Sequence, residues 1–208
     1  MGESGSGKTS LINLIAGLSP PDRGKITVDG RSIQEIDRRT LQRRIGYITQ
    51  EPVIFSDTIF NNVTCWAKPT PENMARFIVA LKKAAVYDFV MGLPEQGQSP
   101  LGNSGIMVSG GQKQRLSIAR ELNKEIDILL MDEATSALDS ETERAIQENI
   151  EALKMQYTIV VIAHRLSTVK NADQILLLKQ GRIEQMGTFG ELVQESKSFK
   201  RMVELQEF

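Results

Sequence analysis

The first residues whose types and spacing could do chemistry are Gly2–Thr9, which fit the pattern G-x-x-x-x-G-K-[ST]. Small residues in such a loop let successive backbone N–H groups converge on phosphate oxygens, and the helix that follows points its positive end at the same place. Lys8 would place a charge between the β- and γ-phosphates, and the Thr9 hydroxyl is a hard oxygen ligand suited to Mg²⁺. The alternative is a flexible Gly/Ser tail that happens to precede a helix.

A second chemical element is a pair of carboxylates at the end of an apolar run. The four residues 128–131 are all apolar and predict a buried strand, and Asp132 and Glu133 follow directly. Ligands in α/β sheets bind at the carboxyl ends of strands, so this position suits a phosphate site. Asp132 could hold Mg²⁺, and Glu133 could accept a proton from a water that attacks the γ-phosphate. The alternative is a strand that ends in a solvated Asp-Glu turn.

Composition limits the classes of protein to which the chain can belong. Lys+Arg number 25 and Asp+Glu 26, and this balance argues against a nucleic-acid partner, which usually demands a basic excess. The single cysteine, Cys65, excludes an internal disulfide and favours a reduced cytosolic setting. No apolar run approaches the roughly 20 residues of a membrane span. We therefore expect any membrane link to come through a partner.

The elements that must position these residues alternate between helix and strand. This alternation predicts an α/β fold with a mostly parallel sheet and helices on both faces. We expect one domain over 1–208, with a helical subdomain at about 57–122. The predicted strands are 25–29, 45–49, 128–131, 158–163, 174–178 and 182–185, and the main helices are 7–16, several between 57 and 92, 111–122, one capped by Ser140 and Glu143, and one from 190 onward.

Six motifs in order resemble the nucleotide-binding domains of ABC transporters, which are P-loop NTPases. Each motif alone is weak or moderate, but the ordered set is specific and spans nearly the whole chain. In family terms they are Walker A (Gly2–Thr9), the Q-loop (Gln50), the signature (Val108-Ser109-Gly110-Gly111-Gln112, with Val in place of Leu), Walker B (128–133), the D-loop (Ser136–Asp139) and the switch histidine (His164).

The resemblance implies roles for particular residues. ATP and Mg²⁺ are the implied ligands; Glu133, His164 and Lys8 are the implied catalytic residues, and Thr9, Gln50 and Asp132 the implied metal ligands. Two of these residues also have a structural alternative. Ser109 could act only as a helix N-cap, and His164 could be a hydrogen-bonded structural residue. The implied nucleotide-binding residues are Gly2, Glu3, Ser4, Gly5, Ser6, Gly7, Lys8, Thr9, Ser10, Gln50, Ser109, Gly110, Gly111 and Gln112.

Partners also follow from the resemblance. Ser109–Gly111 open a helix and form a second anion site, and in the family the signature of one copy closes on ATP held by the other, in a head-to-tail dimer. The amino-acid sequences of residues 51–55, 134–139 and 162–168 are similar to those of exporters in which a membrane domain precedes the cassette. This places the domain on the cytoplasmic face of the membrane. Cys65 and Trp66 lie in the segment that faces the coupling helices, yet we expect both to pack in the core.

A soluble DNA-repair ATPase of the same superfamily is disfavoured, because those proteins carry long coiled-coil insertions that are absent from this sequence. One departure from the family is that the chain starts at Met1, so that the strand before the phosphate loop and earlier strands with an adenine-stacking aromatic are missing. A buried central strand contributes on the order of 10 kcal/mol, as much as a whole domain's stability of ~5–15 kcal/mol. We therefore expect weak or absent ATP binding by this chain, and the alternative function is a non-catalytic cassette fragment.

Overall fold

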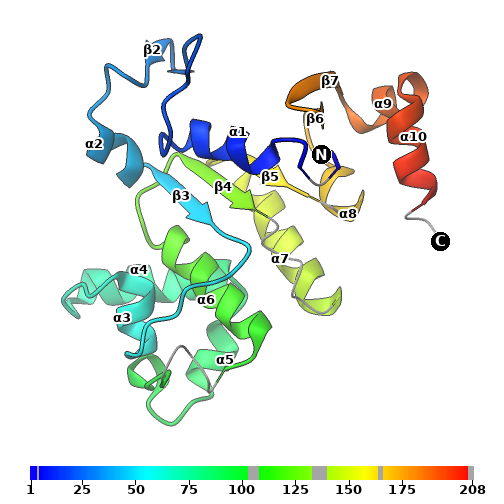
Figure 1. Ribbon diagram of the computed structural model, residues 1–208. Coiled ribbons are helices and arrows are strands. Elements are labelled where there is room, and N and C mark those ends of the chain that lie inside the picture. The colour runs from blue at the N-terminus through cyan, green and yellow to red at the C-terminus, as the bar shows by residue number, and fades with distance from the viewer. Residues whose placement is uncertain (4, 103–107, 133–139, 164–165, 206–208) are drawn as a thin grey trace. The chain divides into compact units, whose positions relative to one another are not determined.

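The computed structural model of residues 1–208 describes the chain except for residue 4 and residues 103–107, 133–139, 164–165 and 206–208. It divides into two compact units, one made of residues 1–26 and 161–208, the other of residues 27–160. Helices and strands alternate along the chain (Figure 1). This alternation confirms the predicted α/β class.

Parallel strands β3 (Ile45–Ile48) and β4 (Ile128–Asp132) are central to the unit of residues 27–160, in a sheet of order β3-β4-β5. Leu129 and Leu130 are fully buried, as expected for a strand covered on both faces. The other elements that begin in this unit are β1 (Thr27–Val28), β2 (Arg31–Ser32), α2 (Arg38–Arg43), α3 (Ile59–Thr64), α4 (Pro71–Lys83), α5 (Tyr87–Met91), η1 (Gln96–Gln98), α6 (Gly110–Leu122), α7 (Ser140–Leu153) and β5 (Thr158–Ile162).

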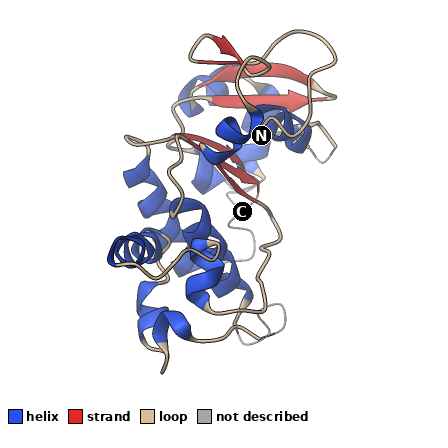
Figure 2. Ribbon diagram, turned by 90° about the vertical axis from the view of Figure 1, so that its left-hand side faces the viewer, coloured by secondary structure: helices blue, strands red, loops and turns tan. Residues whose placement is uncertain are grey.

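Helices α3 to α6 pack against one another in one helical region (Figure 2). Local signals define the start of α4: the Thr70 hydroxyl accepts a hydrogen bond from the amide of Asn73, and Pro71 occupies the first helical position. Inside, Phe77 is fully buried and meets Phe60 edge to face, with 5.2 Å between ring centroids. This packing attaches α4 to α3.

The other unit has its own core under the β6–β7 hairpin. Ile175 and Leu177 of β6 are buried with Leu192, Phe199 and Val203 from the C-terminal helices. The hairpin closes through a two-residue turn, Gln180–Gly181, in which both residues have left-handed φ angles. Its elements are α1 (Lys8–Ile15), α8 (Leu166–Val169), β6 (Ile175–Lys179), β7 (Arg182–Gly187), α9 (Phe189–Glu195) and α10 (Lys197–Glu204).

Some elements differ from the prediction. The strand expected at 25–29 is only β1, which pairs with β2 across a turn whose residues Asp29 and Gly30 are both left-handed. Helix α2 was not predicted; it begins where the Asp37 carboxylate accepts the amide of Thr40 at 2.9 Å, and this bond lowers the pKa of Asp37. The predicted Ser140–Glu143 capping box falls on side chains outside the described set.

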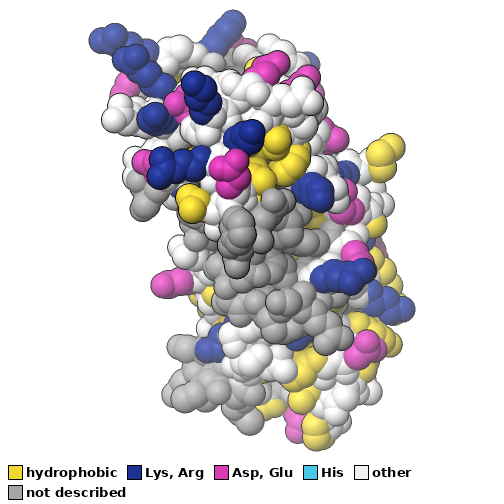
Figure 3. All heavy atoms as spheres, turned by 90° about the vertical axis from the view of Figure 1, so that its right-hand side faces the viewer, with side chains coloured by type: hydrophobic (Ala, Val, Ile, Leu, Met, Phe, Trp, Pro, Cys, Tyr) yellow, Lys and Arg dark blue, Asp and Glu magenta, His cyan; other side chains and the backbone are white. Residues whose placement is uncertain are grey.

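Over the described residues, no helix is both long enough and apolar enough to cross a membrane. On the face shown in Figure 3, Lys and Arg side chains are interspersed with Asp and Glu.

Candidate functional site

Backbone hydrogen bonds attach the phosphate loop to the β6–β7 hairpin at both of its ends. The amine of Met1 donates to Leu176 O at 2.7 Å, and the amide of Leu178 donates to Met1 O at 2.8 Å, so Met1 pairs with β6 as a strand residue would. At the other end, the amide of Gly181 donates to Ser6 O at 3.1 Å. Burial and the charge of Lys8 lower the pKa of the Met1 amine.

Gly2 must be glycine for a geometric reason. Its φ is +152°, and a Cβ there would lie 2.2 Å from Leu178 O and 2.7 Å from the Ser6 hydroxyl. Gly7, at φ +97°, is the residue before α1 and gives that helix end no side-chain cap. The start of α1 therefore has no side-chain cap from its N-cap residue, and its positive end suits an anion.

Lys8 and Ser6 are the two buried polar side chains of this loop. The Lys8 ammonium donates to Gly2 O at 2.7 Å and to Glu3 O at 2.9 Å, and the side chain belongs to a residue only 9% exposed. The Ser6 hydroxyl is buried, and within the described part of the chain it has no hydrogen-bond partner. A phosphate group fits this loop, because its oxygens would supply acceptors to three groups. These are the Lys8 ammonium, now held by neutral carbonyls, the unsatisfied Ser6 hydroxyl and the start of α1, which has no side-chain cap.

The remaining predicted residues of the loop lie at its surface. Glu3, Gly5, Thr9 and Ser10 are exposed, and a Cβ on Gly5 would meet nothing within 4 Å. Thr9 and Ser10 follow Lys8 in the first turn of α1, so their amides share the helix end that no side chain caps. Ser4 lies outside the described residues.

In the unit of residues 27–160, two further predicted residues emerge at one edge of the sheet. Strands β3 and β4 are parallel with Ile48 opposite Met131, so Asp132, the last residue of β4, and Gln50, two residues after β3, both lie at the carboxyl ends of neighbouring strands. The charge of Asp132 is felt at this edge, because burial and then Asp132 raise the pKa of Tyr47 on β3. Gln50 is exposed and Asp132 partly exposed.

The signature residues form the start of α6. The Ser109 hydroxyl accepts from the Gln112 amide at 3.3 Å, and the Gln112 side chain accepts from the Ser109 amide at 2.9 Å, which makes a capping box. The structural role anticipated for Ser109 is thus present. Ser109 and Gly110 are exposed, and helix geometry leaves the amides of Gly110 and Gly111 without intrahelical acceptors.

Besides Ser4, further predicted functional positions lie outside the described part of the chain. Glu133, His164 and the D-loop residues Ser136–Asp139 fall outside the described residues. Their roles stay predictions.

The prediction that Cys65 and Trp66 pack in the core is wrong. Both side chains are exposed, Trp66 at 53%. The reason is the end of α3: Cys65 and Trp66 have consecutive left-handed φ angles of 52° and 61°, which turn the chain outward. The Trp66 indole N–H then donates to the Asp57 carboxylate at 2.7 Å.

Sequence reasoning also missed Gln114, Arg120 and Glu121 on α6. All three are buried although polar or charged. The signal available was their position in a helix whose other inward residues are mostly apolar, because a charge on such a face demands a specific partner. Their hydrogen-bond partners in the neighbouring segment lie before and after Gln50 along the chain.

Comparison with known proteins agrees with this geometry. A sequence model of the ABC transporter family matches residues 1–136. The ATP-dependent lipid A-core flippase of Cupriavidus metallidurans is 46% identical over 194 residues, covering 93% of this chain and 33% of the flippase. ABC transporter B family member 2 of Dictyostelium discoideum is 43% identical over 207 residues, covering 100% of this chain and 15% of that protein. The chain thus spans about a third or less of these relatives.

A solved structure supports the same assignment. A bacterial Atm1-family ABC exporter with ATP bound superposes with a TM-score of 0.92 at 37% identity, over 100% of this chain and 36% of the exporter. The predicted P-loop NTPase fold and the predicted resemblance to exporter cassettes are therefore confirmed. The chain belongs to the ABC transporter family.

Proposed function

We propose that this chain binds ATP with Mg²⁺ and hydrolyses the nucleotide as the cassette of an exporter. The observation that carries the proposal is the Lys8 ammonium, held by the carbonyl oxygens of Gly2 and Glu3 in a loop whose buried Ser6 hydroxyl has no partner among the described residues. An ionised phosphate oxygen is a stronger acceptor for an ammonium than a neutral carbonyl is. Nucleotide binding would therefore draw Lys8 away from its own loop.

Each remaining residue has a proposed task. Glu133 orients the attacking water and accepts its proton, Lys8 stabilises charge on the transferred phosphoryl group, and His164 contacts the γ-phosphate. Mg²⁺, when bound with the nucleotide, neutralises charge on the β- and γ-phosphates, and its proposed ligands are Thr9, Gln50 and Asp132.

Two partners belong to the proposal. The exposed, uncapped amides at Gly110 and Gly111 suit a phosphate presented by a second copy, in a head-to-tail dimer. A membrane domain would dock on the exposed aromatic side chains of Phe55 and Trp66, which lie 5.0 Å apart. The working location is then the cytoplasmic face of the membrane that holds this domain.

The first test measures MgATP binding by calorimetry in the wild-type chain and in Lys8→Met. We expect the variant to lose at least tenfold in affinity, because a charge-assisted contact disappears. Lys200→Met removes an exposed lysine of α10 by the same substitution and serves as the control with unchanged affinity. Equal affinity in wild type and Lys8→Met would refute the placement of the phosphates.

The second test measures phosphate release by Glu133→Gln, with Glu195→Gln as the control at an exposed position of α9. Loss of a general base lowers turnover by about 10²–10⁴-fold, while binding remains. Continued turnover would remove Glu133 from the role. A wild-type chain without measurable ATP binding would instead support the alternative, a non-catalytic cassette fragment.

A further inference from the structure

Helix α6 begins at the signature residues and carries several buried polar side chains further along its length, of which Gln114, Arg120 and Glu121 bind the segment around Gln50. Gln114, Arg120 and Glu121 are 1%, 9% and 7% exposed. Burial of a charge is costly unless specific partners satisfy it. Apart from Lys124, which pairs with Glu121 on the same helix, their partners lie in residues 47–62, around Gln50.

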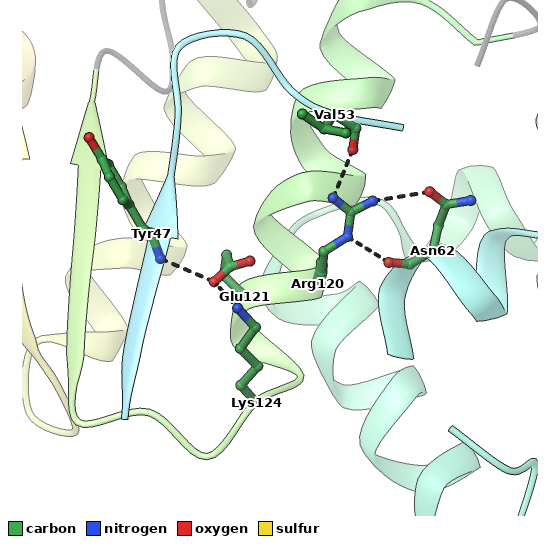
Figure 4. Close-up of polar contacts among 6 residues, drawn as sticks. All are labelled: Tyr47, Val53, Asn62, Arg120, Glu121 and Lys124. Carbon is green, nitrogen blue, oxygen red and sulfur yellow. Dashed lines mark hydrogen bonds and ion pairs between the residues drawn. The ribbon is translucent and has the colours of Figure 1, made fainter. Parts of the chain in front are cut away.

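Arg120 donates three hydrogen bonds on the carboxyl side of Gln50 (Figure 4). Its guanidinium reaches Val53 O at 2.7 Å, Asn62 O at 2.6 Å and the Asn62 side-chain oxygen at 3.0 Å. Asn62 in turn accepts from the amide of Phe55 at 2.8 Å and donates to Phe55 O at 2.9 Å. Arg120 therefore holds the backbone of both Val53 and Phe55, the second through Asn62.

Glu121, the next residue of α6, acts on the amino side of Gln50. Its carboxylate accepts from the amide of Tyr47 at 3.1 Å and pairs with Lys124 at 2.5 Å (Figure 4). Gly46 packs closely beneath this contact, because a Cβ there would lie 3.0 Å from Ile126 Cδ1 and 3.1 Å from Leu129 Cδ1. Between these two anchors, the Gln114 amide donates to Thr49 O at 3.4 Å.

The carboxyl-side anchor extends to the exposed aromatic pair. The guanidinium of Arg120 lies 4.9 Å from the ring centroid of Phe55, which lies 5.0 Å from that of Trp66. Hydrogen bonds from the Asn61 side chain, the Thr58 amide and the Trp66 indole lower the pKa of Asp57, so Asp57 is a charged acceptor that fixes the indole at neutral pH.

We propose that Arg120 and Glu121 are positioning residues that hold the two flanks of the Gln50 segment (residues 47–55) on the signature helix, and that Arg120 transmits displacement of this segment to the Phe55–Trp66 pair. The positional part is independent of nucleotide. The transmission part rests on the proposed function, because it requires MgATP to move the segment.

Amide hydrogen exchange, resolved by residue in the full chain, tests the positional part. Arg120→Lys keeps the charge but loses the guanidinium fork, so we expect at least tenfold faster exchange at Phe55 and little change at Tyr47. Glu121→Leu should give the opposite pattern, and Glu121→Gln, which keeps an oxygen acceptor, should restore slow exchange at Tyr47. Arg115→Lys is the matched control, since Arg115 lies on the same helix and donates to Ala85 O and Gly111 O instead.

Equal exchange at Phe55 in the Arg120→Lys and Arg115→Lys variants would overturn the proposal. If Arg120→Lys does not fold, Glu121→Leu and Glu121→Gln decide the positional part at Tyr47. Phe55→Leu, at a partly exposed position, then decides the link to Trp66.

Fluorescence of Trp66, the single tryptophan of the chain, tests transmission. MgATP should change the emission of the wild-type chain, and Phe55→Leu and Arg120→Lys should lose at least 80% of this change while the Kd for MgATP stays within twofold. In turnover, kcat of Arg120→Lys should fall at least fivefold with KM unchanged. An intact Trp66 response in both variants would overturn transmission. Absence of MgATP binding by the wild-type chain would count against the proposed function and against transmission, and hydrogen exchange would still decide the positional part.

Discussion

Gly2→Ala is the substitution whose effect the structure defines most sharply. The new Cβ would lie 2.2 Å from Leu178 O, well inside the 3.0 Å below which one of the atoms must move. Leu178 O belongs to the backbone of β6, so no flexible side chain can rotate away. The loop and the strand must separate, and the hydrogen bond from the Leu178 amide to Met1 O, 2.8 Å in length, lies at that junction.

The magnitude follows from two contributions. A non-glycine residue held at an unfavourable positive φ costs roughly 1–3 kcal/mol. Loss of the hydrogen bond to Met1 O costs roughly 0.5–1.5 kcal/mol more. We therefore expect Gly2→Ala to lower the free energy of unfolding by about 2–4 kcal/mol.

Two other glycines provide matched controls. Gly5 has φ +76° with nothing within 4 Å of a Cβ. Gly5→Ala should therefore lower the free energy of unfolding only through backbone strain, by roughly 1–2 kcal/mol. Gly190 lies in α9 with an ordinary φ and open space, so Gly190→Ala should stabilise the helix by roughly 0.5–1 kcal/mol.

Urea denaturation followed by far-ultraviolet circular dichroism measures the three free energies, and hydrogen exchange at Leu178 locates the damage. The expected order of stability is Gly190→Ala above wild type, then Gly5→Ala, then Gly2→Ala. A Gly2→Ala variant as stable as Gly5→Ala, with unchanged exchange at Leu178, would show that the loop does not press on β6 as described.

Three further predictions concern the unit of residues 27–160. Hydrogen bonds lower the pKa of Asp57 below its ordinary value of 3.8, so the stability that its carboxylate contributes to the fold is complete above that value and is lost as pH falls through the folded pKa. Trp66 emission should change in that acid window, and Asp57→Asn should abolish this pH dependence. Phe77→Ala removes a fully buried ring and should cost about 3–5 kcal/mol in urea denaturation. Arg44→Met breaks a bidentate pair with Asp127 in which both side chains are more than half exposed, so it should cost less than about 1 kcal/mol, and a larger loss would mean that the pair is less hydrated than its exposure suggests.

The sequence predicted the elements that local signals specify. The apolar run at 128–131 became a buried strand, the Ser-Gly-Gly of the signature became a capped helix start, and the glycine-rich loop before Lys8 led into α1. In each case the chemistry of the first or last residues decides the boundary. The order of six motifs then identified the family, because each motif occupies its own place in one fold.

What the sequence could not supply depends on contacts between distant residues. Nothing local reveals that Arg120 bonds to Asn62, 58 positions away, or that Glu121 bonds to Tyr47 across 74 positions. Trp66 was expected in the core because large aromatic side chains are usually buried, and only the left-handed turn at the end of α3 places it outside.

Helix α6 carries both kinds of feature: the signature residues that the sequence predicted at its start, and the buried residues Arg120 and Glu121 whose partners it did not predict. Its 13 residues span about 20 Å at ~1.5 Å per residue. The sequence predicted an anion site at the exposed Ser109 end. At the other end, Arg120 and Glu121 bind backbone atoms of the Gln50 segment, and residue types alone do not predict such bonds to backbone atoms. A regular helix cannot shorten without breaking its own hydrogen bonds. If the proposed second copy presents a phosphate at Ser109, we therefore expect a shift along the helix axis to reach Arg120 and Glu121, and through them both flanks of Gln50.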